Sequence, residues 1–340
     1  MKFVFDQIVS KPTRVTNYSA ESKPRKDIMK IMVEDGCVPM SVYKRINIRK
    51  MTALNIIRYY FLMAIKIKKG DTLYYQFPIM RSCMPYFILL LFALKKKGVK
   101  IVGIVHDLEY MRNKSDFVYK KRILNCIRHA DLVIVHTPAM KEHLESEGFN
   151  NEIRVLYLFD YLTSDKRIDL MYARTHRNEI VFAGNLGKAP FLRELNEYNF
   201  RKISFNLYGL NADVDFHEGL YKGVFHPEEV STLKGGWGLV WDGDSMDTCS
   251  GLSGNYLRYN APHKLSLYIS CGIPVIVWEE SGLAEWIINN HLGIAIKSIK
   301  ELDNILPQID ENTYCSIQEN VRIYSELLRK GKMILSVVNK

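Results

Sequence analysis

The chain has 340 residues, of which 47% are hydrophobic and 25% are charged, a balance typical of a folded globular protein and not of a long disordered chain. This length is enough for two domains. The 47 Lys and Arg residues exceed the 37 Asp and Glu residues, so the formal net charge is +10, which favours an anionic partner such as a phosphate group, a nucleic acid or an acidic membrane surface.

The chain has no feature typical of a secreted or membrane-spanning protein. Its first residues, MKFVFDQIV, mix charged and apolar side chains, unlike a signal peptide. The apolar run at 85–94 is far shorter than the roughly 20 residues that span a bilayer. Six cysteines without a CxxC pair predict free thiols in a reducing compartment. We therefore expect a cytoplasmic protein, and the lysine clusters of the first half leave open a peripheral contact with the anionic inner face of the cell membrane.

In the first half of the chain, short β-rich runs alternate with helical patterns, which is typical of parallel sheets with crossover helices. We expect a loop at residues 11–27, either a solvated loop or a mobile rim over an acceptor. The expected strands are 2–9, 72–77, 99–106, 131–137 and 153–159, and the expected helices are 53–67 and 84–98.

The second half repeats this alternation, and we expect the domain boundary within residues 159–178, where the apolar period breaks. The prediction is an α/β fold with two Rossmann-like, doubly wound parallel sheets that face a central cleft. The first domain would cover 1–165 and the second 166–320, and a C-terminal helix at 320–340 could pack back onto the first. The expected strands of this half are 178–184, 203–209, 219–225, 237–243, 273–278 and 292–297.

The stretch VFAGNLGKAPFLREL at 181–195 contains a glycine-rich turn after a strand. Gly184 and Asn185 end the strand, and Lys188 precedes an amphipathic helix. Glycines let the backbone approach a ligand closely, while a lysine and free helix amides attract a diphosphate. Turns of this kind also occur without a ligand. The spacing matches neither GxxxxGKS/T nor GxGxxG, which disfavours ATP hydrolysis and a nicotinamide oxidoreductase.

A second candidate phosphate site lies in the stretch 240–270. Asn260 can cap a helix whose first turn contains His263 and Lys264, so that the lysine and the free amides could hold a phosphate. Asp242 and Asp244 follow a strand and resemble a DxD metal site, or they cap a turn. Because two lysines already balance a diphosphate, we expect no metal and no cofactor, and we assign these carboxylates to hydrogen bonds with sugar hydroxyls.

In the first domain, the sequence HDLE places His106, Asp107 and Glu109 directly after a strand. A His-Asp pair is suited to general-base chemistry, because the carboxylate orients or charges the imidazole near neutral pH. The alternative is a histidine that only bonds a backbone carbonyl.

Three stretches, FAGNLGKAPFL, GLVWDGDSMDTCSG and NAPHKLSLYISCGIPVIVW, together with IVHD in the first domain, resemble bacterial glycosyltransferases of the two-domain GT-B type. The likeness is strongest to the β-1,6-galactofuranosyltransferases of O-antigen and capsule assembly, and looser to the streptococcal glucosyltransferases that act on adhesins. It covers nearly the whole chain. It implies cell-surface polysaccharide biosynthesis with a UDP-sugar donor in the second domain, Lys188 and Lys264 on the diphosphate, and Tyr208 near the nucleotide.

One departure from that family bears on the mechanism. Retaining members of this fold often carry two glutamates eight residues apart, but the positions eight before Glu279 and Glu280 are Cys271 and Gly272. This favours an inverting reaction, in which a base takes the proton of the acceptor hydroxyl. We expect that base to be His106 or Asp107.

The partners follow from the same reasoning. UDP-galactofuranose is the expected donor, and UDP-glucose or UDP-galactose is the alternative, with the same phosphate contacts. The acceptor would be a saccharide, either free or linked to a polyprenyl diphosphate, and a homo-oligomer stays open. No nucleic-acid partner is expected, because the 20 tyrosines are scattered and no RNA or DNA module is visible.

Overall fold

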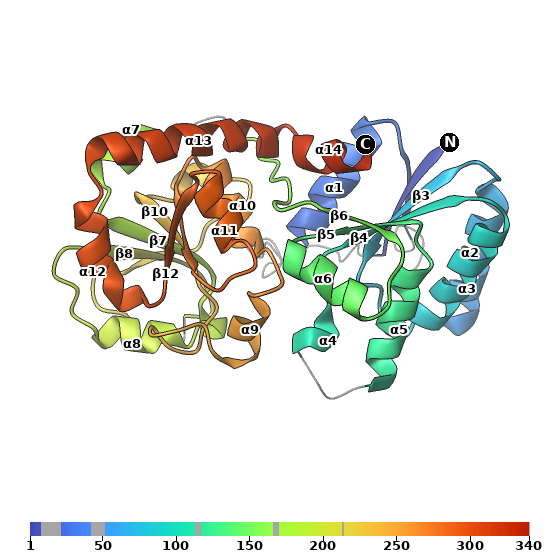
Figure 1. The fold of residues 1–340 in the computed structure, drawn as a ribbon, viewed down its shortest axis with the longest axis horizontal. Helices are drawn as coiled ribbons and strands as arrows, with labels where there is room; N and C mark the ends of the chain where they lie inside the picture. Colours follow the sequence, from blue (N-terminus) through green and yellow to red (C-terminus); the bar gives the residue numbers. More distant parts are fainter. Residues whose placement is uncertain (8–21, 42–51, 113–116, 166–169, 213, 340) are drawn as a thin grey trace. The chain divides into compact units, whose positions relative to one another are not determined.

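The computed structural model describes residues 1–340 except 8–21, 42–51, 113–116, 166–169, 213 and 340. The chain forms two compact units: the first contains Met1–Lys11, Arg25–Leu156 and Leu335–Lys340, and the second contains Pro12–Pro24 and Tyr157–Ile334. Each unit has a six-stranded sheet (Figure 1), and the strand pairs within both sheets are parallel. The predicted α/β class with a doubly wound parallel sheet in each half is confirmed.

The sheet of the first unit has the order β2-β1-β3-β4-β5-β6, so the direction of winding reverses between β1 and β3. Its strands are β1 (Lys2–Asp6), β2 (Val38–Ser41), β3 (Thr72–Phe77), β4 (Lys100–Val105), β5 (Leu132–Val135) and β6 (Glu152–Val155). The helices of this part of the chain are α1 (Lys23–Glu34), α2 (Ala53–Lys66), α3 (Met84–Lys96), α4 (Glu109–Arg112), α5 (Phe117–Arg128) and α6 (Pro138–Ser146), and α14 (Lys332–Val338) ends the chain.

Two elements of the first unit differ from the sequence prediction. Strand β2 was not expected, since the run VPMS is short and contains a proline. Helix α1 begins at Lys23, inside the expected loop 11–27, because Pro24 suits a first helical turn and Ile28, Ile31 and Met32 bury one face of the helix. The part of that loop at 11–21 lies outside the described residues.

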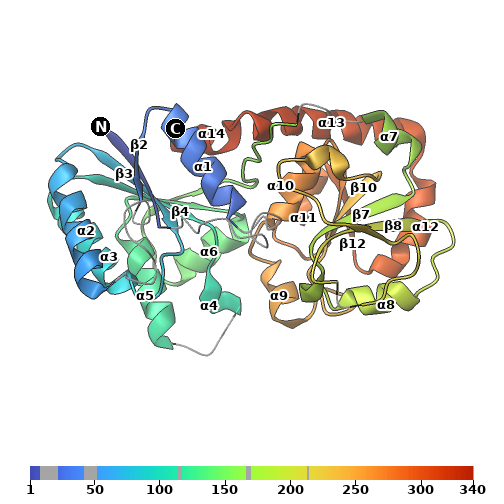
Figure 2. The ribbon, with the colours of Figure 1, turned by 180° about the vertical axis from the view of Figure 1, so that it is seen from behind.

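The sheet of the second unit has the order β12-β11-β10-β7-β8-β9, which is the Rossmann order, with its reversal between β7 and β10 (Figure 2). Its strands are β7 (Glu179–Asn185), β8 (Ser204–Leu210), β9 (Tyr221–Gly223), β10 (Trp237–Val240), β11 (Val275–Trp278) and β12 (Gly293–Ile296). Its helices are α7 (Leu170–Thr175), α8 (Phe191–Glu197), α9 (Gly251–Tyr256), α10 (His263–Ser270), α11 (Ala284–Asn289), α12 (Leu302–Ile305) and α13 (Glu311–Arg329).

Both faces of this second sheet are buried under helices. Successive side chains of a strand point to opposite faces, and neighbouring residues of β7 accordingly belong to different core clusters. Phe182 of β7 belongs to a core cluster with Phe191 of α8 and Leu302 of α12. The preceding residue, Val181, belongs to the other cluster, with Tyr268 of α10. Within the described parts of the chain, no helix is long and apolar enough to cross a membrane.

Candidate active site

The candidate donor site lies where the strand order of the second sheet reverses. Strand β7 ends at Gly184 and Asn185, and its neighbour β10 is followed by Trp241 and Asp242. In open parallel sheets, ligands bind beyond the carboxyl ends of the strands at such a reversal, because the crossover helices leave on opposite faces there. The residues at these two strand ends are therefore the ones that a ligand of this unit would meet.

Lys264 reaches this strand edge from the first turn of α10. Its Nζ atom donates to Oδ1 of Asp242 at 2.5 Å and to the carbonyl oxygen of Trp241 at 3.2 Å. The same ammonium lies 4.6 Å from the centre of the Phe182 ring. A Cβ atom added to Gly184 would be only 3.8 Å from Cδ of Lys264, so the lysine stem passes close to the end of β7. The structure thus brings Gly184, Asp242 and Lys264 together.

Helix α10 begins without the cap that the sequence suggested. Pro262, with φ −60° and ψ 138°, precedes the first helical residue, and no side chain caps the helix. Asn260 is buried, but it does not serve as the N-cap. The first amides of α10 thus have no side-chain acceptor from the N-cap residue, as a phosphate-binding helix start requires.

Gly209 fixes how closely β7 and β8 approach each other. It lies opposite Gly184 in the parallel pairing, and a Cβ atom at Gly209 would be 1.7 Å from the carbonyl oxygen of Gly184. Its φ of +152° also disfavours other residues. Any larger residue at 209 would push β7 and β8 apart and displace the strand end that Lys264 contacts.

The turn after β7 carries two more of the predicted donor-binding residues. The exposed Asn185 accepts a hydrogen bond through Oδ1 from Asn211 Nδ2 at 3.1 Å. Lys188 ends the following 3₁₀ turn, Leu186–Lys188, and is exposed. Among the described residues, Lys188 has no ion-pair or hydrogen-bond partner. Its cation is available to an anion, but the structure records no contact between it and the Asp242–Lys264 pair.

The two aspartates of the WDGDS stretch have different surroundings. Asp242 is paired with Lys264, whereas the exposed Asp244 lies against Gly251 at the start of α9, where an added Cβ would be 1.9 Å from Oδ2 of Asp244. Gly251 has φ +77°, a backbone conformation that favours glycine at this position. In the described residues, no group of three or more His, Cys, Asp and Glu side chains is arranged to hold a metal.

Two other predicted donor residues are held in packing contacts. His263 stacks on Tyr161 with ring centres 4.9 Å apart, and burial, with a smaller effect of Lys23, lowers the pKa of His263 to about 3 against a hydrogen bond to the Asp160 backbone. His263 is therefore neutral at pH 7 and adds no positive charge. Tyr208 is 4% exposed, and its hydroxyl accepts from the amide of Lys234 at 3.3 Å. The structure records no hydrogen bond or ion pair between either side chain and the Asp242–Lys264 pair.

In the first unit, His106 directly follows β4 and contacts a neighbouring strand. Its Nε2 atom lies 2.8 Å from Oε1 of Gln76 in β3, and Gln76 is fully buried. The Nε2 atom of Gln76 donates to the carbonyl oxygen of Arg25 at 3.0 Å. Because a carbonyl only accepts, the amide nitrogen of Gln76 must face Arg25 and its oxygen must face His106. In this contact His106 is therefore the donor through Nε2, and in the neutral imidazole Nδ1 carries the lone pair.

A buried ion pair holds Gln76 in place. Arg25 of α1 is paired with Asp6, the last residue of β1, and both side chains are nearly inaccessible. Arg25 also donates to the carbonyl oxygens of Gln76 and Pro78, each at 3.0 Å. These residues stand at the carboxyl ends of β1 and β3, at the reversal of the first sheet. Sequence analysis missed them; the signal available was a polar residue at the end of an apolar strand.

The neighbours of His106 make separate contacts. Oδ2 of Asp107 pairs with Arg112 at 3.3 Å, and Glu109 accepts a hydrogen bond from the hydroxyl of Tyr119. The Nε2 atom of His106 is thus oriented by Gln76.

Family models match both units: the glucosyltransferase 3-like N-terminal domain at residues 7–158 and the glucosyltransferase 3-like C-terminal domain at residues 180–340. The β-1,6-galactofuranosyltransferase WbbI of Escherichia coli is 32% identical over 81% of this chain and 80% of its own. Glucosyltransferase 3 of Streptococcus parasanguinis is 28% identical over 78% of this chain and 76% of its own.

Solved structures share the fold. HepE of Anabaena, crystallised in complex with UDP, has a TM-score of 0.58 at 15% identity and covers 98% of this chain and 97% of its own. Sucrose-phosphate synthase of Thermosynechococcus elongatus has a TM-score of 0.55 at 14% identity and covers 89% of this chain and 82% of its own. The two units are those of a GT-B glycosyltransferase, and the chain belongs to the glucosyltransferase 3-like family of glycosyltransferases.

Proposed function

We propose that this protein transfers galactofuranose from UDP-galactofuranose to a saccharide acceptor, with inversion at the anomeric carbon, in cell-surface polysaccharide biosynthesis. The observation that carries the donor side is the ammonium of Lys264, held at the reversal of the second sheet beside Gly184. The sugar assignment is supported by the 32% identity to a β-1,6-galactofuranosyltransferase. The use of UDP is supported by HepE, which shares the fold and was crystallised with UDP.

On the donor side, Lys264, the exposed Lys188 and the first amides of α10 would hold the diphosphate. The leaving UDP gains negative charge as the bond from its phosphate oxygen to the anomeric carbon breaks, so cations fixed beforehand stabilise the transition state more than the ground state. Two lysines would then do the work of a metal ion, and we propose a reaction that needs no metal and no cofactor. Asp242 and Asp244 would accept hydrogen bonds from sugar hydroxyls.

On the acceptor side, His106 or Asp107 would act as the base. The acceptor hydroxyl oxygen attacks the anomeric carbon opposite UDP, the bond to UDP breaks with its electron pair on the phosphate oxygen, and the hydroxyl proton passes to the base. If the base is His106, the contact with Gln76 leaves Nδ1, which is buried in the structure, as the nitrogen that would accept the proton. A saccharide linked to a polyprenyl diphosphate would place the protein at the inner face of the cell membrane.

A second candidate is a pyranosyl transferase that uses UDP-glucose or UDP-galactose, because two relatives are named glucosyltransferase 3. Both candidates need the same phosphate contacts and differ in the sugar pocket. The deciding experiment assays purified protein with UDP-galactofuranose, UDP-glucose and UDP-galactose in parallel, and determines the anomeric configuration of the product by NMR. Turnover only with a pyranose donor would reject galactofuranose, and retained configuration would reject inversion.

A further inference from the structure

Helix α2 is apolar on two opposite faces. One face packs into the first unit through Ile56, Tyr60 and Met63, and the Tyr60 ring centre lies 5.6 Å from that of Phe87 in α3. The opposite face carries apolar side chains that are 45–73% exposed. An amphipathic surface helix normally presents polar residues there. The exposed apolar residues of α2 are Leu54, Ile57, Phe61, Leu62 and Ile65.

Helix α3 packs beside α2 and continues this surface. Leu89 is 64% exposed and Phe92 is 47% exposed, although α3 buries its other side in the core. We call these two residues and the five on α2 the apolar face of the first unit. Exposed apolar side chains gathered on neighbouring helices indicate an interaction surface, since monomeric proteins usually scatter them.

The apolar face ends in a cluster of lysines. Lys97 Nζ donates to the carbonyl oxygens of Ala64 and Ile67 at 2.9 and 2.6 Å, which joins the ends of α2 and α3. Lys69 packs its stem close to Gly98, where an added Cβ would be 3.3 Å from Cγ of Lys69. Lys96 lies over the ring of Phe92 at 4.5 Å. Lysines that follow or end α2 and α3 therefore lie close to one another, beside the apolar side chains of the two helices.

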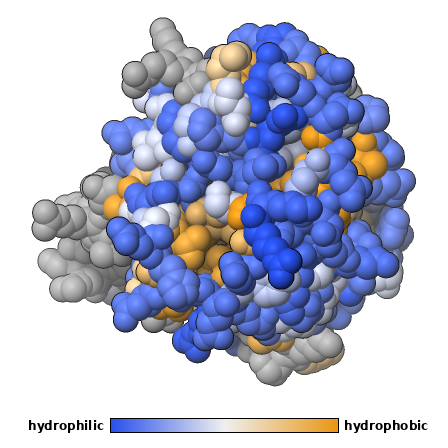
Figure 3. Space-filling model, turned by 90° about the vertical axis from the view of Figure 1, so that its left-hand side faces the viewer, coloured by the Kyte–Doolittle hydropathy of each residue, from blue (hydrophilic) through white to orange (hydrophobic). Residues whose placement is uncertain are grey.

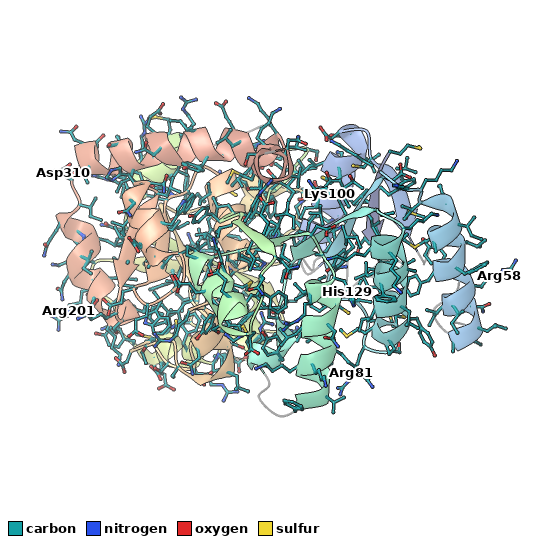
Figure 4. The ribbon with its side chains drawn as sticks, turned by 45° about the vertical axis from the view of Figure 1, so that its right-hand side comes forward. Arg58, Arg81, Lys100, His129, Arg201 and Asp310 are labelled. Carbon is teal, nitrogen blue, oxygen red and sulfur yellow. The ribbon has the colours of Figure 1, made fainter. Side chains whose placement is uncertain are left out.

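No carboxylate balances this charge within the two helical segments. Residues 53–70 contain one arginine and three lysines, residues 84–100 contain four lysines, and neither stretch contains Asp or Glu. Arg58 projects outward from α2 in Figure 4. The next acidic residue, Asp71, accepts hydrogen bonds from the N-terminal amine and from the amide of Lys68. The two helices thus present an apolar face with an excess of basic residues, of which Lys95 pairs with Asp131 outside the two segments.

We propose that the apolar face of the first unit docks on an anionic phospholipid surface. Apolar side chains of one helix face enter the boundary between headgroups and acyl chains, while lysines beside them bind lipid phosphates. This charge complementarity favours a membrane over a second copy of the chain, whose identical face would bring like charges together. The inference extends the proposed function, since a lipid-linked acceptor lies at a membrane. Binding to vesicles is measured without any substrate, so the membrane proposal and the proposed function can fail separately.

The chain offers a matched control on α13. Ile323 and Leu327 have the same i, i+4 spacing as Phe61 and Ile65, and they are 50% and 37% exposed. Their helix carries acidic as well as basic side chains, with Arg322 paired to Glu319 and Glu326. In the face drawn in Figure 3, hydrophilic residues cover most of the surface and hydrophobic residues form smaller patches.

The experiment is co-sedimentation with vesicles of phosphatidylcholine, with and without phosphatidylglycerol, at low and high salt. The parent protein should bind the anionic vesicles, and the double variant Phe61→Ser, Ile65→Ser should bind at least 10-fold more weakly, whereas Ile323→Ser, Leu327→Ser should bind like the parent. A second pair, Lys69→Gln with Lys96→Gln, should weaken binding about 10-fold or more, and Lys202→Gln with Lys297→Gln should not. Melting temperatures identify any variant that has lost its fold.

Three results would overturn the proposal. The first is equal binding to neutral and anionic vesicles. The second is unchanged binding of two folded double variants, Phe61→Ser, Ile65→Ser and Lys69→Gln, Lys96→Gln. The third is a dimer in solution, measured by light scattering, that the Phe61→Ser, Ile65→Ser exchange dissociates, since the face would then join two copies of the chain.

Discussion

The replacement Lys264→Ala tests the donor site most directly. The lysine makes three contacts that fix its ammonium, with Asp242, the Trp241 carbonyl and the Phe182 ring, so little reorganisation is needed when charge develops on the leaving diphosphate. Loss of one such contact costs about 2 to 4 kcal/mol in the transition state, or about 10² to 10³ in rate. Lys188→Ala should also lower the rate of transfer, as Lys264→Ala does.

The structure adds a second effect of the same replacement. Without Lys264, the carboxylate of Asp242 remains at the strand end with its partner removed, and it repels a diphosphate bound there. We therefore expect UDP to bind Lys264→Ala more weakly than it binds the double variant Lys264→Ala, Asp242→Asn. The two replacements should be non-additive, as expected for residues in contact.

The assay combines turnover with UDP-galactofuranose, UDP affinity by calorimetry and the melting temperature. Lys300→Ala is the matched control, because Lys300 pairs with Asp247 at 2.9 Å but both side chains are largely exposed, at 37% and 62%; its turnover should stay near that of the parent. Parent-like turnover of folded Lys264→Ala would show that the phosphates bind elsewhere. A double variant no better than the single one would show that Asp242 does not face the phosphate.

Three further predictions concern metal, base and pH. Transfer should survive EDTA, and its loss on chelation with recovery on adding Mn²⁺ would make Asp242 and Asp244 metal ligands instead. His106→Ala or Asp107→Asn should leave UDP affinity unchanged and lower transfer by about 10² or more, and a folded variant with the parent rate would be excluded as the base. Burial lowers the pKa of His136 to about 4, against its hydrogen bond to the Val105 carbonyl and with Arg112 adding to the lowering, so the unfolded state binds more protons below pH 6.5. Between pH 6.5 and pH 4 the free energy of unfolding should fall by about 3 kcal/mol through this residue. In His136→Gln, measured by urea unfolding, the free energy of unfolding should depend less steeply on pH over this range. An unchanged dependence would contradict the lowered pKa of His136.

The donor side of the candidate site could be predicted because it depends on local patterns. Gly184 lies at the end of one apolar strand, Asp242 follows another, and Lys264 stands in the first turn of a helix. In a parallel sheet all carboxyl ends share one edge, so strand-end residues of neighbouring strands must come close together. The order of the strands then decides which of these strand-end residues lie side by side, and a doubly wound sheet allows few orders.

The rest depends on contacts between residues far apart in the chain. The stacking of His263 on Tyr161 and the burial of Tyr208 follow from packing that no local pattern reveals. Strand β2 and the start of α1 were missed because their sequences have weak propensity and gain their stability from packing in the first unit. Gln76 escaped notice because its partner, His106, lies on the next strand.

Gln76 gives a prediction that separates catalysis from simple bracing, and it rests on His106 being the base. Gln76→Leu removes both side-chain hydrogen bonds, to His106 and to the Arg25 carbonyl, so turnover should fall about 10-fold or more while UDP affinity, set by the other unit, stays unchanged. Gln76→Glu keeps an acceptor for Nε2 of His106 and adds a negative charge, which favours the imidazolium and raises the pKa of the histidine. A base must be deprotonated, so the acid limb of the pH–rate profile should move to higher pH, with turnover above that of Gln76→Leu on the alkaline side. A bracing role alone would lower the melting temperature of both variants and leave the pH profile in place.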